Sequence, residues 1–192
     1  MSHFFAYVSR MKLIQRWGLM RNTQTENIQE HSLQVAMVAH TLAVIRNRLY
    51  GGNVNPERVA TLAMYHDCSE VITGDLPTPI KNFNREIVTA YKKIEHLACE
   101  RIYKMLPEEL REDYRDIFFP CEQDDEHWQL VKAADKLCAY LKCLEELQAG
   151  NNGFLKAERA VMAGLMKMNM PEVTYFVETF SPSFSLTLDE LN

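Results

Sequence analysis

Residues 55–70 of the chain read NPERVATLAMYHDCSE. The Asn–Pro pair predicts a helix start, because an asparagine side chain caps a helix N-terminus and a proline fits the first turn. The apolar side chains of Val59, Leu62 and Ala63 follow at three- and four-residue intervals, which is the spacing of one helix face. We therefore expect a helix that starts at the Asn–Pro pair, carries the polar tail HDCSE and breaks at Gly74.

The same helical spacing of apolar residues extends over the chain on both sides of this segment. The predicted helices cover residues 2–14, 30–48, 55–73, 87–105, 107–118, 124–149, 154–168 and 171–180. Residues 17–29 are polar and predict a loop, and the two prolines of Asp75–Pro79 predict a stiff one. No segment alternates with period two, so the fold class is predicted to be all-α, with seven or eight helices around one core.

Length and composition limit the classes of function. A chain of 192 residues with 47% apolar and 24% charged residues is typical of one globular domain, taken here as residues 1–192. The net charge of −5 argues against a nucleic-acid polymer as partner. Five cysteines without a CxxC pair, and the lack of a long apolar run near the N-terminus, predict a cytoplasmic protein without a membrane segment.

Two residues break the pattern of their helices. Asp135 shares a predicted face with the apolar Val131 and Cys138. A carboxylate in such surroundings must be paired, protonated or bound to a cation. Taken alone, Asp135 fits a salt bridge or a helix-cap contact. His31 lies on the apolar face that includes Val35, and taken alone it fits a core or capping histidine.

His66 and Asp67 end an apolar run, and Glu70 lies one helical turn beyond His66. Adjacent helical side chains point about 100° apart, so this pair converges only on a point close to the helix surface, where a metal ion can sit. Taken alone, a His–Asp dipeptide fits an accidental pair far better than a metal site. With His31 and Asp135, however, it offers two imidazoles and two carboxylates from three helices, a mixture that borderline divalent ions favour.

These residues resemble the signature of the HD-domain phosphohydrolase superfamily, in which a histidine precedes an adjacent His–Asp pair and a distant aspartate follows. The flanking sequence is similar to that of the bacterial 5'-deoxynucleotidases of this superfamily, from about residue 3 to residue 191. The stretches that carry the similarity are Arg16–Trp17, Glu30–Ser32, His66–Glu70, Gly74–Pro79 and Ala134–Lys136.

The resemblance implies one divalent metal ion, with cobalt or manganese as the expected activator. Its ligands would be His31, His66, Asp67 and Asp135. It also implies hydrolysis of deoxyribonucleoside 5'-monophosphates to deoxynucleoside and phosphate by a water activated at the metal, with Glu70 assisting proton transfer. A homodimer is implied on the same grounds.

The resemblance implies in addition that Arg16 orients the phosphate and Trp17 contacts the substrate. The nucleoside pocket would be lined by Asp75, Leu76, Pro77 and Thr78. A guanidinium can bind phosphate oxygens in bidentate fashion, which a lysine cannot reproduce. An apolar surface against C2' of the sugar, from Trp17 or from the proline-rich loop, would disfavour a ribose hydroxyl.

Other interpretations of the same residues stay open at this stage. Arg16 alone fits a surface charge, and Trp17 alone fits a buried anchor. Another HD activity, on cyclic nucleotides or guanosine alarmones, would require a longer or doubly metallated site. A non-catalytic helical module that binds metal for stability is the alternative of a different class. The presence of all four expected ligands and of Glu70 favours catalysis.

Overall fold

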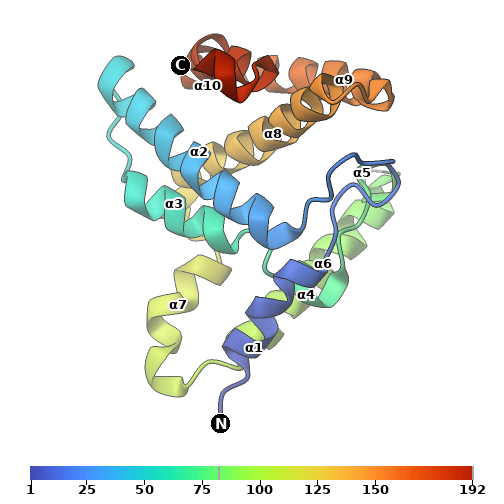
Figure 1. The fold of residues 1–192 in the computed structure, drawn as a ribbon. Helices are drawn as coiled ribbons and strands as arrows, with labels where there is room; N and C mark the ends of the chain where they lie inside the picture. The colour runs from blue at the N-terminus through green and yellow to red at the C-terminus, as the bar shows by residue number, and fades with distance from the viewer. Residues whose placement is uncertain (82, 192) are drawn as a thin grey trace.

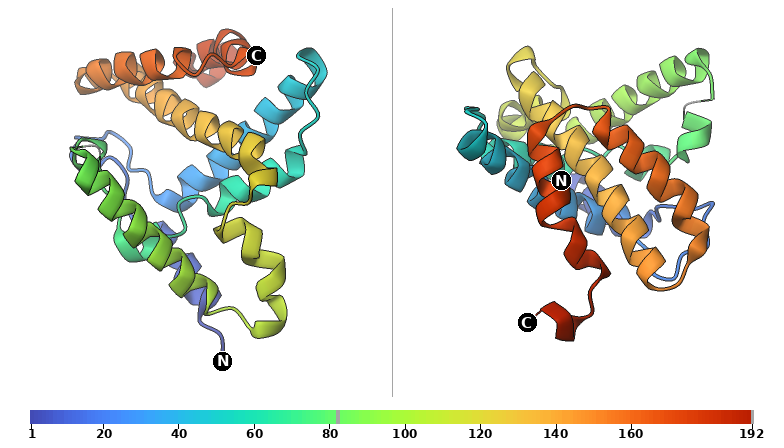
Figure 2. Two further views of the ribbon diagram at one scale, coloured as in Figure 1. Left: turned by 180° about the vertical axis from the view of Figure 1, so that it is seen from behind. Right: turned by 90° about the horizontal axis from the view of Figure 1, so that it is seen from above.

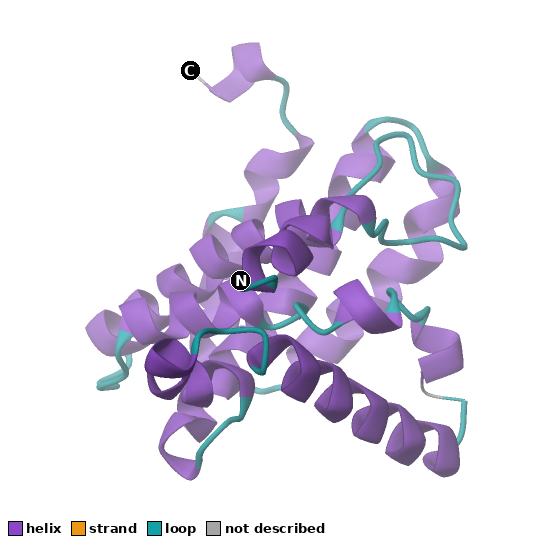
Figure 3. Ribbon diagram, turned by 90° about the horizontal axis from the view of Figure 1, so that it is seen from below, coloured by secondary structure: helices purple, strands orange, loops and turns teal. Residues whose placement is uncertain are grey.

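The computed structural model describes residues 1–81 and 83–191, and this part of the chain folds into helices joined by loops (Figures 1 and 3). The α-helices are α1 (Phe4–Val8), α2 (Ile28–Leu49), α3 (Pro56–Tyr65), α4 (Glu70–Thr73), α5 (Thr78–Lys81), α6 (Arg85–Tyr103), α7 (Arg111–Phe118), α8 (Asp125–Gln148), α9 (Leu155–Met166) and α10 (Pro171–Thr179). Within the described ranges no strand forms, so the all-α prediction is confirmed.

Short 3₁₀ segments join or extend these helices. They are η1 (Ser9–Leu13), η2 (Glu108–Leu110), η3 (Glu122–Asp124), η4 (Asn152–Phe154), η5 (Ser181–Ser185) and η6 (Leu188–Leu191). The predicted helix over residues 2–14 is therefore wrong as one α-helix, because it divides into α1 and η1. The Ser9 hydroxyl donates to the backbone oxygen of Ala6, and such local bonds compete with the helical pattern. None of the described helices is long and apolar enough to cross a membrane.

The predicted helix over residues 55–73 is interrupted at its polar tail. Asn55 and Pro56 start α3 as predicted, but the helix ends at Tyr65. Residues 66–69 form turns, in which the Cys68 N–H donates to the Tyr65 oxygen, and α4 follows. Gly74, with φ of +73°, ends α4 in a conformation that side chains with a Cβ seldom adopt.

Two buried apolar clusters make up the core, and the segments that carry the predicted site residues pass from one to the other. One cluster lies among α2, α3, α8, α9 and α10, and the other among α1, α6 and α7 (Figures 1 and 2). At the start of α2, Ile28 belongs to the second cluster and Val35 to the first. After α3, the chain passes from Ala63 in the first cluster to Cys68 in the second. His31 and His66 therefore lie where the two clusters meet.

A capping box starts α2 two residues before the predicted position. The Asn27 side chain accepts hydrogen bonds from the N–H groups of Gln29 and Glu30, both at 3.0 Å. The Glu30 carboxylate accepts in return from the Asn27 N–H. This reciprocal arrangement satisfies donors that the first helical turn leaves free.

We expect Asn27→Ala to lower the free energy of unfolding by about 1 kcal/mol, because it removes the acceptor for these N–H groups. Asn27→Ser is the matched control, since its hydroxyl retains an acceptor and should keep most of the stability. Urea denaturation followed by circular dichroism measures both variants. Equal stability of Asn27→Ala and wild type would show that the cap contributes nothing.

Candidate metal centre and substrate face

His31 is fully buried in the first turns of α2 and faces two carboxylates. Its Nε2 lies 2.9 Å from Oδ1 of Asp135, which α8 supplies, and 3.7 Å from Oδ2 of Asp67. The Asp135 side chain is 43% exposed and is paired with the buried His31, as expected for a carboxylate that shares a face with apolar residues. One side of Asp135 faces His31 while the other remains open to solvent.

His66 and Asp67 lie in the turn that follows α3, and their side chains converge on the same point. Nε2 of His66 lies 3.2 Å from Oδ2 of Asp67 and 4.0 Å from Oδ1 of Asp135. The other ring nitrogen, Nδ1, lies 2.7 Å from the backbone oxygen of Ala63, which orients the imidazole. We call His31, His66, Asp67 and Asp135 the His–Asp cluster.

The His–Asp cluster has separations suited to a single metal ion. Ligand atoms of His31, His66 and Asp67 lie within 4.8 Å of one another. Two atoms that are each about 2.0–2.2 Å from one ion can be no more than about 4.4 Å apart. The distances from Asp67 to the two imidazoles, 3.7 and 3.2 Å, and those from Asp135, 2.9 and 4.0 Å, meet this limit. Moreover, Nε2 of His66 is buried without a hydrogen-bond partner within the described structure, as expected for an atom that binds an ion.

The charges in the His–Asp cluster depend on one another. Burial alone would lower the pKa of His66, but the neighbouring Asp67 and Asp135 raise it to about 9. Burial alone would raise the pKa of Asp67, but His66, His31 and Arg16 lower it well below its usual value. The carboxylates thus stay ionised in a buried place, where a cation is stabilised.

Glu26 is a residue of this site that the sequence analysis missed. Its Oε1 lies 3.4 Å from Nδ1 of His31, on the side of the ring away from the cluster. Its Oε2 accepts hydrogen bonds from Nε of Arg16 at 3.2 Å and from Nε1 of Trp17 at 3.0 Å. One carboxylate therefore orients three predicted site residues. Glu26 lies in the predicted loop, where no periodic pattern distinguishes it from other polar residues.

Arg16 lies against the His–Asp cluster. Its NH1 donates to Oδ2 of Asp67 at 3.3 Å, and its NH2 lies 3.9 Å from Oδ1 of Asp135. The Arg16 side chain is only 14% exposed. Burial alone would lower its pKa, but Asp67, Asp135 and Glu26 raise it, so the guanidinium remains charged. A fixed cation beside a potential metal site is well placed to bind an anionic group.

Both the backbone conformation of Trp17 and the contacts of its indole ring are distinctive. Its φ of +58° is unusual for a residue with a side chain. The indole packs against the buried Phe154 with ring centroids 5.3 Å apart. The bond from Nε1 to Glu26 connects this ring to the His31 side of the site.

Glu70 lies at the start of α4 with 5% exposure, and its Oε2 has no hydrogen-bond partner in the described structure. Burial and the nearby charges of Asp67 and Asp75 raise its pKa to about 9, while Arg16 and Lys81 oppose the shift. These surroundings therefore favour the protonated form of the carboxyl. Lys81, at the end of α5, is a second charged neighbour that the sequence analysis did not identify.

The predicted pocket residues 75–78 connect α4 to α5. Asp75 is half-buried, and its pKa is raised by burial and by Asp67, against the effect of Arg16. Leu76 and Pro77 are also half-buried, whereas Thr78 is exposed. Of these four residues, Asp75 is thus the one whose charge interacts with the site.

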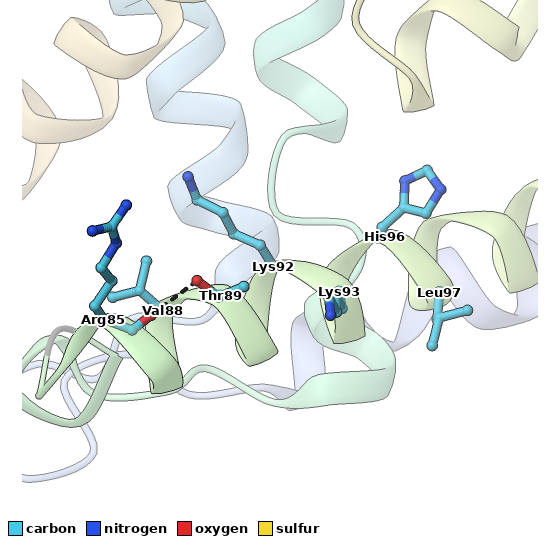
Figure 4. Close-up of a pocket in the computed structure, with 7 residues that line it drawn as sticks. All are labelled: Arg85, Val88, Thr89, Lys92, Lys93, His96 and Leu97. Carbon is cyan, nitrogen blue, oxygen red and sulfur yellow. Dashed lines mark hydrogen bonds between the residues drawn. The ribbon is translucent and has the colours of Figure 1, made fainter.

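A separate cavity of about 680 Å³ follows the exposed face of α6 (Figure 4). Arg85 and Lys92 extend from one side of this helix in the close-up. The cavity is lined by Arg85, Val88, Thr89, Lys92, Lys93, His96 and Leu97. This lining contains no carboxylate and none of the predicted site residues, so the cavity is not part of the candidate centre.

Comparison with known proteins gives strong matches over almost the whole chain. The sequence model of a family described as 5'-deoxynucleotidase YfbR-like matches residues 3–184. A 5'-deoxynucleotidase of Vibrio cholerae is 59% identical over 191 residues, covering 100% of this chain and 98% of its own. The 5'-deoxynucleotidase YfbR of Escherichia coli is also 59% identical, covering 100% of this chain and 96% of its own.

Solved structures share the fold at lower identity. An HD-domain phosphohydrolase of Listeria innocua has a TM-score of 0.80 and 23% identity, covering 95% of this chain and 88% of its own. The HD phosphohydrolase DatZ of cyanophage S-2L, bound to dA and one catalytic Zn²⁺, has a TM-score of 0.66 and 18% identity. Its match covers 93% of this chain and 96% of that protein. Both likenesses support the helical architecture.

We expect Glu26→Gln to weaken the binding of a divalent metal by about 10–100-fold, because His31 loses the anionic neighbour that orients its ring. Titration of metal-free protein with Mn²⁺ or Co²⁺ in a calorimeter measures the affinity. Glu30→Gln is the matched control, since it makes the same charge change nearby and keeps a capping-box side chain. Identical affinities for both variants would remove Glu26 from the site.

Proposed function

Because this chain belongs to the 5'-deoxynucleotidase YfbR-like family, we propose that it hydrolyses deoxyribonucleoside 5'-monophosphates to deoxynucleoside and phosphate in a metal-dependent reaction. The chain is 59% identical over its whole length to 5'-deoxynucleotidases of Vibrio cholerae and Escherichia coli, which identifies it as a 5'-deoxynucleotidase. The observation that carries the mechanism is the convergence of His31, His66 and Asp67 on one point beside Asp135. The assignment of roles to individual residues is our proposal.

His31, His66, Asp67 and Asp135 are the proposed ligands of one divalent ion. Two imidazoles and two carboxylates are a mixed donor set, which suits the proposed cobalt or manganese. Zinc is a further candidate, because the DatZ structure contains one catalytic Zn²⁺. When bound, such an ion polarises a phosphoryl oxygen and lowers the pKa of a water molecule.

Arg16 is the proposed phosphate-orienting residue. Its guanidinium is already fixed by Glu26 and Asp67, so the side chain loses little conformational entropy when the substrate binds. A phosphate monoester needs its negative charge neutralised before a nucleophile can approach. Arg16 can supply this neutralisation through two parallel N–H donors.

Glu70 is the proposed proton donor to the departing 5'-oxygen of the nucleoside. Its carboxyl is buried with Oε2 unpartnered in the described structure, and burial with the neighbouring Asp67 and Asp75 raises its pKa, which favours the protonated form that can donate. Proton transfer to the leaving oxygen converts a poor alkoxide leaving group into an alcohol and leaves Glu70 as a carboxylate. That carboxylate can then take a proton from solvent and restore the starting state.

Trp17 and the residues Asp75, Leu76, Pro77 and Thr78 are the proposed nucleoside-contacting set. The fixed indole of Trp17 supplies an apolar surface, and Leu76 and Pro77 are half-buried in the loop on the Glu70 side. An apolar surface against C2' of the sugar leaves a ribose hydroxyl without a hydrogen-bond partner, which disfavours ribonucleotides.

The proposal also covers the domain organisation, the oligomeric state and the location of the protein. We take residues 1–192 as one domain, because the family match spans residues 3–184 and the site lies between the two apolar clusters. The proposed homodimer is supported by the exposed apolar side chains of Leu33 and Met37 on α2. A cytoplasmic location is supported by the five unpaired cysteines.

The test is release of inorganic phosphate from all deoxyribonucleoside and ribonucleoside 5'-monophosphates, with cobalt, manganese, zinc and magnesium compared. We expect hydrolysis of the deoxy substrates, loss of activity with a chelator, and recovery with metal while circular dichroism shows a retained fold. Equal rates on dAMP and AMP would contradict the selectivity. Preferential hydrolysis of a cyclic nucleotide or an alarmone would favour another HD activity, and metal binding without any turnover would favour a non-catalytic module.

We expect Glu70→Gln to lower kcat by about 10²–10⁴-fold while metal binding is retained, because an amide cannot donate the required proton. The wild-type kcat should fall as the pH rises through the pKa of Glu70, since only the protonated carboxyl donates. The residual activity of the variant should lack this alkaline limb. Glu57→Gln, on the exposed start of α3, is the matched control. Unchanged turnover of Glu70→Gln with bound metal would exclude the role.

A further inference from the structure

The loop of residues 14–27 carries Arg16 and Trp17 and is closed at its neck. The Arg16 N–H donates to the Glu26 oxygen at 2.8 Å, and the Ile28 N–H donates to the Ile14 oxygen at 3.0 Å. Nine residues, 17–25, thus project from this neck. Their far end lies beside the connection between α8 and α9 (Figure 2).

Glu146 holds the far end of the loop. It lies in the last turns of α8, is only 1% exposed, and uses both carboxylate oxygens. The Thr23 N–H donates to Oε2 at 2.9 Å, and the Thr23 hydroxyl donates to the same oxygen at 2.8 Å. The Gln24 N–H lies 3.3 Å from Oε1. A buried carboxylate therefore accepts hydrogen bonds from the backbone of a surface loop 122 residues away in the sequence.

Two further side chains complete this network and also bind the loop. Nζ of Lys142 donates to Oε1 of Glu146 and, at 2.7 Å, to the Gln24 oxygen. Nδ2 of Asn151 donates at 2.7 Å both to Oε2 of Glu146 and to the Arg21 oxygen. Burial alone would raise the pKa of Glu146, but the bonds from Lys142, Thr23 and Asn151 hold it at about 2, so the carboxylate is ionised.

The same network fixes the surface against which Trp17 packs. Asn151 precedes η4, where its side chain accepts from the Gly153 N–H at 3.3 Å. Phe154 ends η4, is fully buried, and contacts the Trp17 indole. Glu146 thus connects to Trp17 by two routes, through the loop backbone and through Asn151 and Phe154.

We propose that Glu146 is a positioning residue for substrate binding, which acts by fixing the 17–25 loop and the Phe154 surface so that the Trp17 indole is held against Phe154 and Glu26. Glu146 itself contacts no reacting atom. The inference rests on the proposed function in one respect, the contact of Trp17 with the substrate. The position of the indole is a separate matter that can be measured without any substrate.

The first readout is the position of the indole in the protein without nucleotide. A Trp128→Phe background leaves Trp17 as the single tryptophan, and the Trp128 Nε1 makes no hydrogen bond within the described structure that this change would break. In this background we expect Glu146→Gln to raise the acrylamide quenching constant of Trp17 about twofold or more. An amide at position 146 would turn a donor toward Thr23 or Lys142 and release the loop.

The second readout separates positioning from chemistry. With dAMP as substrate, Glu146→Gln should raise KM about tenfold or more with kcat within about threefold of the parent, because a misplaced indole weakens binding in the ground state and the transition state alike. Metal content should be unchanged. Glu145→Gln is the matched control, since it removes the same charge from an exposed neighbour and should alter neither readout.

Thr23→Ala keeps the test decisive if Glu146→Gln fails to fold, because Thr23 is an exposed loop residue and its loss cannot remove the helical core. It should shift quenching and KM in the same direction by a smaller factor. Folded variants with unchanged quenching would overturn the proposal, as would a raised KM without a change at Trp17. If quenching changes but the parent protein hydrolyses no nucleotide, the proposed function fails and the positioning by Glu146 stands.

Discussion

The site depends on balancing negative charge in a place where water is scarce. Five carboxyl groups gather around two imidazoles and one guanidinium; they belong to Glu26, Asp67, Glu70, Asp75 and Asp135. Like charges repel strongly at low dielectric, so these groups cannot all ionise independently. The carboxylates of Asp67 and Glu26 stay ionised against the imidazoles and Arg16, while Glu70 keeps its proton. A divalent cation would add the positive charge that two imidazoles supply only when protonated.

Segments between helices carry several of the site residues. His66 and Asp67 follow α3 in a turn, where adjacent side chains converge close to the backbone and their ligand atoms lie 3.2 Å apart. The loop before α2 has the same effect for Arg16, which is brought within hydrogen-bond distance of Asp67 although 51 residues separate them. The helices fix the position of the His–Asp cluster, and the turns and loops between them orient the side chains of the site.

Much of this could be predicted from the sequence. Period and capping signals located most helices to within a few residues, because apolar spacing and the Asn–Pro start act locally. Asp135 and His31 stand out because each breaks the apolar pattern of its predicted helix, and His66 and Asp67 because they end an apolar run. The resemblance to HD-domain phosphohydrolases joins the four as one ligand set. The end of α3 at Tyr65 could not be predicted in this way, since the segment after it has no proline or glycine before Gly74. Glu26 and Glu146 were missed for a different reason. Glu26 meets Arg16 across a loop without periodic pattern, and Glu146 meets Thr23 from a distant part of the sequence, so only the folded chain brings these partners together.

The two overlooked glutamates give the site its rigidity. Glu26 fixes the near end of the loop against His31, and Glu146 fixes the far end against α8. Asp135 lies on that same helix, eleven residues before Glu146, which corresponds to about 16 Å of helix. The residue that faces the proposed metal and the residue that holds the proposed substrate loop therefore belong to one rigid element. Because a small misplacement of reacting groups lowers a rate strongly, a common support for both halves of the site is a physical requirement of the proposed reaction.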